Sequence, residues 1–382
     1  MIYDEENTLC VTCASGIEKV TKKELERLGY GETPAVNGVL TFKGNGFDVA
    51  RCNVNLRTAD RVYIKICEFP VTTFDELFDG VKSVKWKNYF PSDAKVIVNG
   101  KCVKSKIFAI SACQSIIKKA VAENLCEAYH KNRISEFGAE YSLKFSIYKD
   151  VFTLLLDTSG AGLNKRGYRD LVGIAPIKET LAASLVLLSD YYYKRPFLDP
   201  FCGSGTIAIE AAMIAQNIAP GKLRKFAFND WNNFNEKYFR KAIEEANDKE
   251  KREKSSEILG SDIDKKAIKL ALRHAERAGV KDYVNFSVSA VKDVKISLKC
   301  GTIVTNPPYG TRVYDKEQAE ECYKDLGNLY RSLDGWSAFV ITSDNDFQKR
   351  FGLKADRIRK LYNSDLECNY YYYYGKKEKE ND

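Results

Sequence analysis

The spacing of apolar positions changes along the chain and predicts two kinds of architecture. Before Gly160, short alternating segments predict strands, at residues 8–12, 39–42, 61–69, 95–98, 141–148 and 151–156. Apolar residues three and four positions apart predict helices, at residues 17–28, 74–81 and 111–130. The last two strands flank Lys149-Asp150 and are expected to form a hairpin. This part of the chain therefore has the pattern of an α+β region.

After Gly160, strands alternate with longer helices. Strands are predicted at residues 197–199, 258–262, 285–288, 302–305 and 338–341. Helices are predicted at residues 206–215 and 265–278, and from Pro176 onward. This alternation predicts a doubly wound, mostly parallel sheet, which is the Rossmann-like α/β class. Residues 216–257 form a charged insertion without recognisable chemistry.

Composition limits the function classes. The 382 residues predict two or three domains, and 44% hydrophobic with 29% charged residues is ordinary for a globular protein. No run of about 18 apolar residues predicts a membrane span, and the acidic start does not resemble a signal peptide. The eleven scattered cysteines are expected to be reduced packing residues of a cytoplasmic protein. The chain has only two histidines, which is few for hydrolytic catalysis or metal binding, so we expect no bound metal ion.

Positive charge is concentrated in one segment, although the net charge of +8 is modest. Residues 81–120 contain nine lysines and one acidic residue, with four aromatic residues among them. Lysines mixed with aromatic rings suit phosphates and unpaired bases, but a solvated lysine-rich face would have the same composition. The residues predicted to bind nucleic acid here are Lys82, Lys85, Lys87, Lys101, Lys104 and Lys106.

A first motif, Asp-Pro-Phe-Cys-Gly-Ser-Gly-Thr at residues 199–206, joins a predicted buried strand to a predicted helix. Glycines allow positive φ angles and close approach of a ligand, and free amides at a helix N-terminus can bind a carboxylate. A phosphate-binding loop would need Lys and then Ser or Thr after its last glycine, where this chain has Ile207. A nucleoside with a carboxylate tail therefore fits better than a triphosphate.

Individual residues of this site are assigned from their positions. Asp199 ends its strand and is expected either to accept from the amino group of the ligand or to hold the loop. Asp262 ends the next strand and is expected to accept from ribose hydroxyls, unless it only caps a helix. The residues predicted to bind the cofactor are Asp199, Phe201, Gly203, Gly205, Thr206, Asp262 and Asn306.

A second motif, Asn-Pro-Pro-Tyr-Gly at residues 306–310, follows an apolar strand and is expected at the carboxyl edge of the sheet. An exocyclic amine on a base is a poor nucleophile, because its lone pair is delocalised into the ring. The Asn306 side-chain oxygen and the Pro307 carbonyl can accept its two hydrogens. Two prolines make the segment rigid, and Tyr309 can stack on the base. The predicted catalytic residues are Asn306, Pro307, Pro308 and Tyr309.

Together, the two motifs predict methyl transfer from S-adenosylmethionine to an exocyclic nitrogen of a nucleobase. Catalysis would consist of positioning and hydrogen bonding, and the target base would have to leave its stack. Adenine N6, cytosine N4 and guanine N2 all present the same kind of amine. The tetrapeptide therefore does not choose among them.

Both motifs resemble those of class I methyltransferases that modify base amino groups. Residues 163–169 (Leu-Asn-Lys-Arg-Gly-Tyr-Arg) and 175–183 (Ala-Pro-Ile-Lys-Glu-Thr-Leu-Ala-Ala) are also similar to stretches of the THUMP-domain RNA methyltransferases, of the bacterial 23S rRNA guanine-N2 type. The similarity reaches about Gly375. It implies a ferredoxin-like domain at 1–57, a THUMP RNA-binding domain at 58–160 and a class I methyltransferase catalytic domain at 161–375. The polar composition of residues 376–382 predicts a disordered tail.

The resemblance also implies a cofactor, a substrate and a product. These are S-adenosylmethionine, RNA in the form of 23S rRNA or a precursor of the large subunit, and N2-methylguanosine. The basic residues Lys165, Arg166 and Arg169 either hold RNA phosphate near the active site or belong only to an interdomain linker. We expect a cytoplasmic monomer or weak dimer.

Two departures from the family pattern and two alternatives remain. Many methyltransferases have an acid after the third strand that contacts adenine, but here Ser289-Ala290 occupy that place, and Asp293 is only nearby. The chain is also too short for a second methyltransferase domain, so one modification is expected.

The runner-up is an adenine-N6 DNA or RNA methyltransferase, because Asn-Pro-Pro-Tyr also occurs in those enzymes. The third hypothesis is a non-catalytic RNA-binding ribosome-assembly factor.

Overall fold

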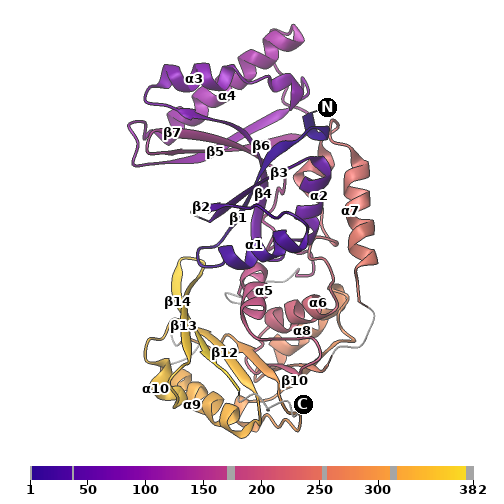
Figure 1. The fold of residues 1–382 in the computed structure, drawn as a ribbon, viewed down its shortest axis with the longest axis vertical. Helices are drawn as coiled ribbons and strands as arrows, with labels where there is room; N and C mark the ends of the chain where they lie inside the picture. The colour runs from indigo at the N-terminus through magenta and orange to yellow at the C-terminus, as the bar shows by residue number, and fades with distance from the viewer. Residues whose placement is uncertain (1, 37, 170–176, 252–255, 310–315, 376–382) are drawn as a thin grey trace. The chain divides into compact units, whose positions relative to one another are not determined.

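The computed structural model describes residues 2–36, 38–169, 177–251, 256–309 and 316–375. Figure 1 shows its helices and strands, which group into two compact units. Unit 1 contains residues 1–13, 25–163 and 224–245, and unit 2 contains residues 14–24, 164–223 and 246–382. Residues 224–245 thus belong to unit 1, whereas the predicted boundaries place them in the catalytic domain. The predicted tail at 376–382, Pro176 and Gly310 lie outside the described residues.

Unit 1 contains a seven-stranded sheet in the order β2-β3-β1-β4-β7-β6-β5. Its strands are β1 (Asn7–Cys13), β2 (Ala35–Val36), β3 (Val39–Gly44), β4 (Ala59–Pro70), β5 (Lys95–Val103), β6 (Glu140–Tyr148) and β7 (Val151–Asp157). Neighbouring strands are antiparallel except β5 and β6. A parallel pair needs a crossover connection, which the helix between these two strands provides.

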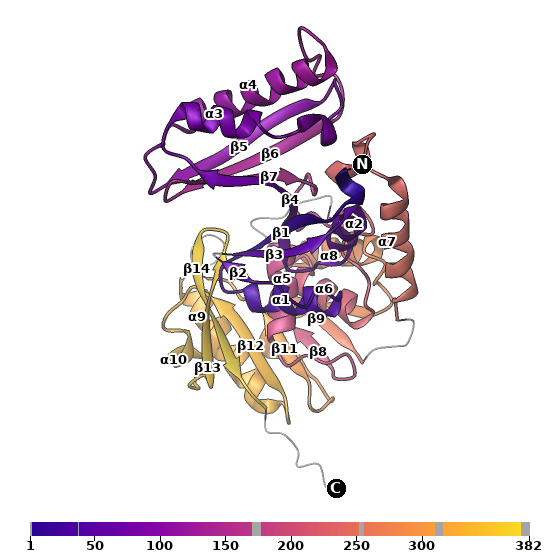
Figure 2. The ribbon, with the colours of Figure 1, turned by 45° about the horizontal axis from the view of Figure 1, so that its top comes forward.

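The helices before residue 164 are α1 (Glu18–Arg27), α2 (Gly46–Asn55), α3 (Phe74–Lys82) and α4 (Ile110–Tyr129), with 3-10 turns η1 (Ile2–Asp4) and η2 (Trp86–Asn88). In Figure 2, α3 and α4 lie along one face of β5, β6 and β7. A capping box between Thr73 and Glu76 starts α3. The buried residues of α4 recur at helical spacing, as its sequence predicts.

Unit 2 contains a second seven-stranded sheet in the order β10-β9-β8-β11-β12-β14-β13. Its strands are β8 (Phe197–Asp199), β9 (Ile258–Asp262), β10 (Val284–Val288), β11 (Thr302–Thr305), β12 (Ser337–Thr342), β13 (Arg357–Asn363) and β14 (Leu366–Tyr373). The first five in this order are parallel, and β14 and β13 are antiparallel. The prediction of a mostly parallel α/β sheet is confirmed.

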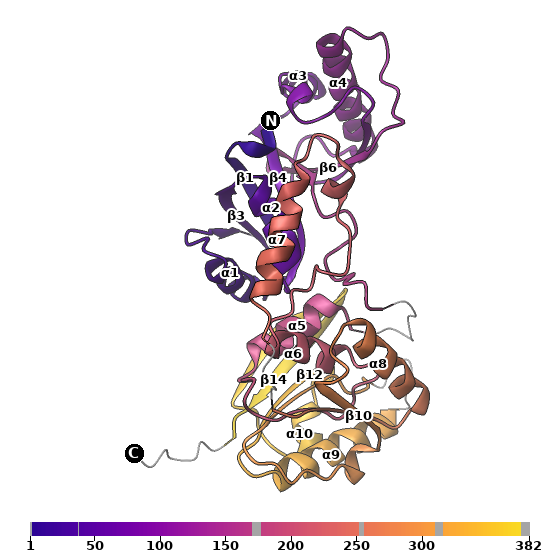
Figure 3. The same cartoon turned by 90° about the vertical axis from the view of Figure 1, so that its right-hand side faces the viewer.

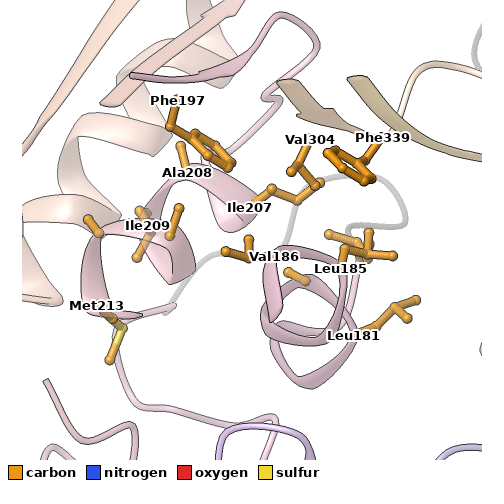
Figure 4. Packing of buried hydrophobic residues seen from close by; sticks show 14 of the residues in the cluster. Leu181, Leu185, Val186, Phe197, Ile207, Ala208, Ile209, Met213, Val304 and Phe339 are labelled. Atoms are coloured by element: carbon orange, nitrogen blue, oxygen red, sulfur yellow. The ribbon is translucent and has the colours of Figure 1, made fainter. Parts of the chain in front are cut away.

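The helices of unit 2 cover both faces of this sheet, as Figure 3 shows. They include α5 (Glu179–Leu188), α6 (Thr206–Ala215), α8 (Lys265–Arg277), α9 (Lys316–Ser332) and α10 (Phe347–Phe351), with the 3-10 turn η4 (Val291–Asp293). Residues 14–24, which contain most of α1, also belong to unit 2. Apolar residues of α5, α6 and α8 share one core with Phe197, Val304 and Phe339 of the sheet (Figure 4). Residues of α9 and α10 form a second core against the opposite face. Burial on both faces explains why these strands are continuously apolar.

Several elements do not follow from the sequence pattern, among them the helices α2, α9 and α10 and the strands β2 and β13. The charged stretch at 216–257 contains η3 (Ala227–Asp230) and the helix α7 (Glu236–Asp248). The run of tyrosines near the C-terminus forms β14, where Tyr370 and Tyr372 join one core while Tyr371 and Tyr373 join the other. Five consecutive tyrosines (370–374) show no alternation of polar and apolar residues, so the pattern does not reveal this strand.

Candidate active site

The two motifs meet at the carboxyl edge of the unit 2 sheet. β8 lies between β9 and β11 and runs parallel to both. The chain continues from β8 to β9 and β10 on one side, and β11 then lies on the other side of β8. Ligands bind at such a switch point in open α/β sheets, outside the carboxyl ends of the strands. Asp199, Asp262 and Asn306 end or follow these three strands.

The glycine loop has the geometry that the first motif predicts. Gly205 has φ +84° and is the N-cap of α6, and an added Cβ would lie 2.8 Å from Phe286 and 2.9 Å from Ala271. Gly203 has φ +51°, and no described atom lies within 4 Å of the position of an added Cβ. The amides of the first turn, from Thr206 onward, have no side-chain cap. They are therefore placed to bind an anionic group.

Asp199 is the most unusual ionisable group at this edge. Its side chain is 1% exposed, and Oδ1 accepts hydrogen bonds from the Thr305 hydroxyl (2.6 Å) and the Phe201 amide (3.3 Å). Oδ2 is buried and accepts no hydrogen bond from any residue that the structure describes. Burial, with a smaller contribution from Asp262, raises the pKa of Asp199 to about 7. Asp199 therefore holds the loop and also presents one acceptor without a partner.

These features fit a cofactor that carries an ammonium and a carboxylate group. A buried acceptor without a donor is costly, and an ammonium group would satisfy Oδ2 of Asp199. The uncapped amides after Gly205 suit the carboxylate. S-Adenosylmethionine has both groups on its methionine part and would supply an activated methyl group when bound.

Asp262 has a structural role in this loop. Its Oδ2 accepts from the Gly203 amide (2.9 Å) and its Oδ1 from the Asp264 amide (2.9 Å). Each oxygen keeps a second lone pair, so the ribose contact stays a prediction. After the third strand, the Ser289 amide donates to the Asp262 carbonyl (3.0 Å), and Asp293 lies in η4. The side chain that contacts adenine therefore stays unassigned.

The second motif differs in one respect from its prediction. The Tyr309 hydroxyl donates to Oδ1 of Asn306 at 2.5 Å, and the thiol of Cys368 lies 3.8 Å from the Tyr309 oxygen. The Tyr309 ring packs against the core that β14 helps to form, and burial raises its pKa. In this conformation Tyr309 is thus an internal partner of Asn306, whose oxygen keeps one lone pair. Stacking of the partly exposed ring on a base stays a prediction.

A tyrosine that the motif does not contain positions the prolines. Tyr323 of α9 is fully buried, and its hydroxyl donates to the Pro308 carbonyl at 2.8 Å and lies 3.1 Å from the Thr342 hydroxyl. The Pro307 carbonyl accepts no hydrogen bond from the residues described, which is consistent with its predicted role as an acceptor. Sequence reasoning missed Tyr323, since no pattern links it to a motif fifteen residues earlier, and it missed Thr305, which directly precedes Asn306.

Two of the three basic residues near residue 166 are engaged in ion pairs inside unit 2. Arg166 is 2% exposed and pairs with the fully buried Glu210 at 3.2 and 3.3 Å, and the Tyr168 hydroxyl donates to the same carboxylate. Arg169 pairs with the buried Glu179 at 3.1 Å. The prediction is therefore wrong for Arg166 and Arg169, because their charges are neutralised inside unit 2. Lys165 is exposed.

The predicted RNA-binding lysines of unit 1 fall into two groups. Lys82 pairs with Glu123 and Glu127, and Lys87 lies over the Tyr129 ring and 3.4 Å from the Ala128 carbonyl. The other four are exposed and form no ion pair with any described residue: Lys85, Lys101, Lys104 and Lys106. The charge of the segment is thus partly neutralised along α4.

The raised pKa of Asp199 predicts how pH affects the protein. Its folded pKa of about 7 exceeds the unfolded value near 3.9, so the ionised carboxylate destabilises the ligand-free fold as pH rises from about 4 to 7. A bound ammonium group favours the ionised form. We therefore expect the affinity for S-adenosylmethionine, measured by calorimetry between pH 5.5 and 8.5, to rise through pH 7.

The matched variant for this measurement is Asp199→Asn. It should bind S-adenosylmethionine about tenfold more weakly at pH 8, because a charge-assisted hydrogen bond is lost. It should also lose the part of the pH dependence that arises from the protein. If the variant and the native protein show the same pH dependence, the titrating group is the ligand amine and not Asp199.

Other classes of site find no support in the described part of the chain. No group of three or more His, Cys, Asp or Glu residues there could hold a metal ion. All eleven cysteines are free. Within the same residues, no helix has the length and apolar character needed to cross a bilayer.

Comparison with known families and proteins gives matches along the whole chain. Residues 8–63 match the RlmL ferredoxin-like domain, residues 71–157 the THUMP domain, and residues 166–372 the RMKL-like methyltransferase domain. The curated protein YpsC of Bacillus subtilis strain 168, whose name describes a provisional RNA methyltransferase, is 44% identical over 371 residues. This alignment covers 97% of this chain and 96% of YpsC.

Two solved structures are similar over nearly their full length. SMU.472, described as a candidate methyltransferase and crystallised with S-adenosylhomocysteine, is 39% identical, with a TM-score of 0.92, and the match covers 98% of this chain and 100% of that chain. A protein of Listeria monocytogenes strain 4b F2365, named as a predicted N6-adenine-specific DNA methylase, is 43% identical, with a TM-score of 0.93 and 97% of both chains covered. The names of all three relatives agree on methyl transfer, whereas YpsC is named for RNA and the Listeria protein for DNA.

Proposed function

This chain belongs to the RMKL-like methyltransferase family, in which it is an S-adenosylmethionine-dependent RNA methyltransferase, and we propose that it methylates N2 of a guanosine in 23S rRNA. The observation that supports methyl transfer to a base amine is the placement of Asn306 at the carboxyl end of β11, beside β8. The choice of guanine N2 in 23S rRNA rests on the resemblance of residues 163–169 and 175–183 to enzymes of that type. The ferredoxin-like and THUMP matches before the catalytic domain support RNA over DNA.

In the proposed site, one group of residues holds the cofactor and another group holds the base. Asp199 and the first amides of α6 bind the methionine part of S-adenosylmethionine, which supplies the methyl group. Asn306 and the Pro307 carbonyl accept the two hydrogens of the guanine amine and direct its lone pair. Tyr323 fixes the Pro308 carbonyl and thereby the position of both prolines. Rate enhancement then comes from orientation and hydrogen bonding.

The test is mass spectrometry of nucleosides after incubation with labelled S-adenosylmethionine. The substrates are ribosomal RNA, precursor particles and DNA from cells that lack this gene. We expect label in N2-methylguanosine from the 23S fraction and none in DNA. Asn306→Ala is the control, because it removes the acceptor for the amine.

Other outcomes identify the alternatives. Label in N6-methyladenine, in DNA or RNA, would contradict the guanine assignment, and label in DNA would also agree with the name of the Listeria relative. No label in any substrate, with cofactor bound, would favour a non-catalytic assembly factor. We further propose that the protein acts in the cytoplasm as a monomer or weak dimer, and its free cysteines are consistent with a reducing compartment.

A further inference from the structure

A buried hydroxyl connects the carboxyl ends of β8 and β11, the two strands that lead into the motifs of the site. The paired register of these strands ends at Leu198 and Ile303, and β11 then continues to Thr305. There the Thr305 hydroxyl donates to Oδ1 of Asp199 at 2.6 Å, and the two residues are 0% and 1% exposed. A side-chain hydrogen bond therefore joins the end of β8 to the residue that directly precedes Asn306.

This hydrogen bond determines which way the Asp199 carboxylate faces. The terminal torsion of an aspartate is soft, so donors that engage one oxygen fix the direction of the other. Oδ1 accepts from the Thr305 hydroxyl and from the Phe201 amide, and Oδ2 is the buried acceptor that an ammonium group would satisfy. A donor to a carboxylate also favours its ionised form, which is the form that attracts a cation. Thr305 thus prepares Asp199 for the amino group of the cofactor.

The same residue fixes the start of the second motif. The backbone of Thr305 pairs with Val340 of β12 on one side, and its hydroxyl binds Asp199 on the other. Asn306 is the next residue, so a shift of Thr305 away from Asp199 would move Asn306 as well. Reacting atoms must be aligned at about 3–3.5 Å, and a displacement of about 1 Å can cost about a hundredfold in rate. The link between the two strands should therefore affect the rate of methyl transfer as well as cofactor affinity.

We propose that Thr305 is a positioning residue that couples the two halves of the site, because it orients the Asp199 carboxylate toward the cofactor and holds Asn306 beside the end of β8. Thr305 acts through these two neighbours and takes no direct part in the chemical step. The proposal rests on methyl transfer from S-adenosylmethionine, which is part of the proposed function, but it does not depend on which base receives the methyl group.

The test variant is full-length Thr305→Val, which removes the hydroxyl and keeps a branched side chain that suits a strand. S-Adenosylmethionine should bind it about tenfold more weakly at pH 6, because a hydrogen bond to a charged group is lost. Single-turnover methyl transfer with saturating cofactor should also be slower, by about tenfold or more. Thr305→Ser keeps a hydroxyl and should restore most of the affinity and the rate. Native affinity and rate in Thr305→Val would overturn the proposal.

The matched control is Thr302→Val on the same strand. Thr302 is fully buried, and its hydroxyl donates to Oδ1 of Asp190 at 2.9 Å, so the control loses the same kind of hydrogen bond at the other end of β11. It should keep the native cofactor affinity and the native rate. Equal losses in Thr302→Val and Thr305→Val would overturn the proposal, because they would show a general effect of weakening β11.

The pH dependence of cofactor binding separates positioning from a general structural defect. Two titratable groups act on Asp199 in the described part of the chain, Asp262 and the Cys202 thiol, and burial raises the pKa of that thiol, so it stays uncharged near neutral pH. Loss of the Thr305 donor should raise the pKa of Asp199 above its native value of about 7. The deficit of Thr305→Val should therefore shrink from about tenfold at pH 6 to about threefold or less at pH 8.5.

The comparison of variant with native protein at each pH cancels the titration of the ligand amine. A deficit of the same size at pH 6 and pH 8.5 would contradict the proposed action on Asp199.

A double-mutant cycle with Asp199→Asn tests whether Thr305 acts on the cofactor through Asp199. If it does, adding Thr305→Val to Asp199→Asn should weaken cofactor binding by no more than about threefold, because the two residues share one interaction. A further tenfold loss would overturn the proposal. These affinities are measured by calorimetry without nucleic acid, so failure to detect N2-methylguanosine would contradict the proposed function alone.

Discussion

Replacing Asn306 with alanine is expected to reduce methyl transfer by about a hundredfold to a thousandfold, while the affinity for S-adenosylmethionine changes by no more than about twofold. The Asn306 oxygen is the side-chain acceptor that can orient the target amine, and the neighbouring Pro307 contributes only a backbone carbonyl. In the proposed site, Asp199 and the glycine loop hold the cofactor on β8 and α6, so its binding should survive. Single-turnover rates and calorimetry measure the two quantities separately.

The matched variant is Tyr309→Phe, which removes the hydroxyl that donates to Asn306 and keeps the ring. Because the change frees the Asn306 oxygen, most of the turnover should remain. Full turnover in Asn306→Ala would rule out the proposed role of the amide. A large loss of cofactor affinity in that variant would assign Asn306 mainly to the cofactor.

The sequence predicts that the site lies at the carboxyl edge of the sheet, because each motif lies at the end of an apolar strand. Parallel strands bring their carboxyl ends together, so Asp199, Asp262 and Asn306 converge without any knowledge of the contacts. The contacts themselves are not predictable in this way. Tyr323 reaches Pro308 from the middle of a helix, and the unpartnered oxygen of Asp199 follows from its burial.

Charged residues show most clearly that composition alone does not predict which side chains are free to bind RNA. Lys82 and Lys101 occur in one basic segment, but Lys82 pairs with two glutamates of α4 and Lys101 has no ion pair among the described residues. Arg166 stands beside the exposed Lys165 in sequence and is buried against Glu210, forty-four residues away. Only the tertiary fold decides which of these charges is available to RNA.

The pair of Arg166 and Glu210 leads to the largest expected effect on stability. Glu210 lies on α6, just after the cofactor loop, and both side chains are almost completely buried. Arg166→Met leaves the Glu210 carboxylate with a hydrogen bond from the Tyr168 hydroxyl but without its counter-charge. Breaking a buried ion pair in this way should destabilise the fold by about 3–5 kcal/mol. Urea unfolding of the full-length protein measures this change.

The double variant Arg166→Met/Glu210→Gln separates a buried charge from lost packing. Glutamine keeps an acceptor for the Tyr168 hydroxyl and carries no charge, so the double variant should recover much of the lost stability. Lys281→Met is the control, because its pair with Glu276 is exposed and its loss should change stability by no more than about 0.5 kcal/mol. If the double variant is as unstable as Arg166→Met, the arginine stabilises the fold mainly through its packing. Recovery would show that the buried arginine neutralises a carboxylate beneath the cofactor loop, a role that excludes contact with RNA phosphate.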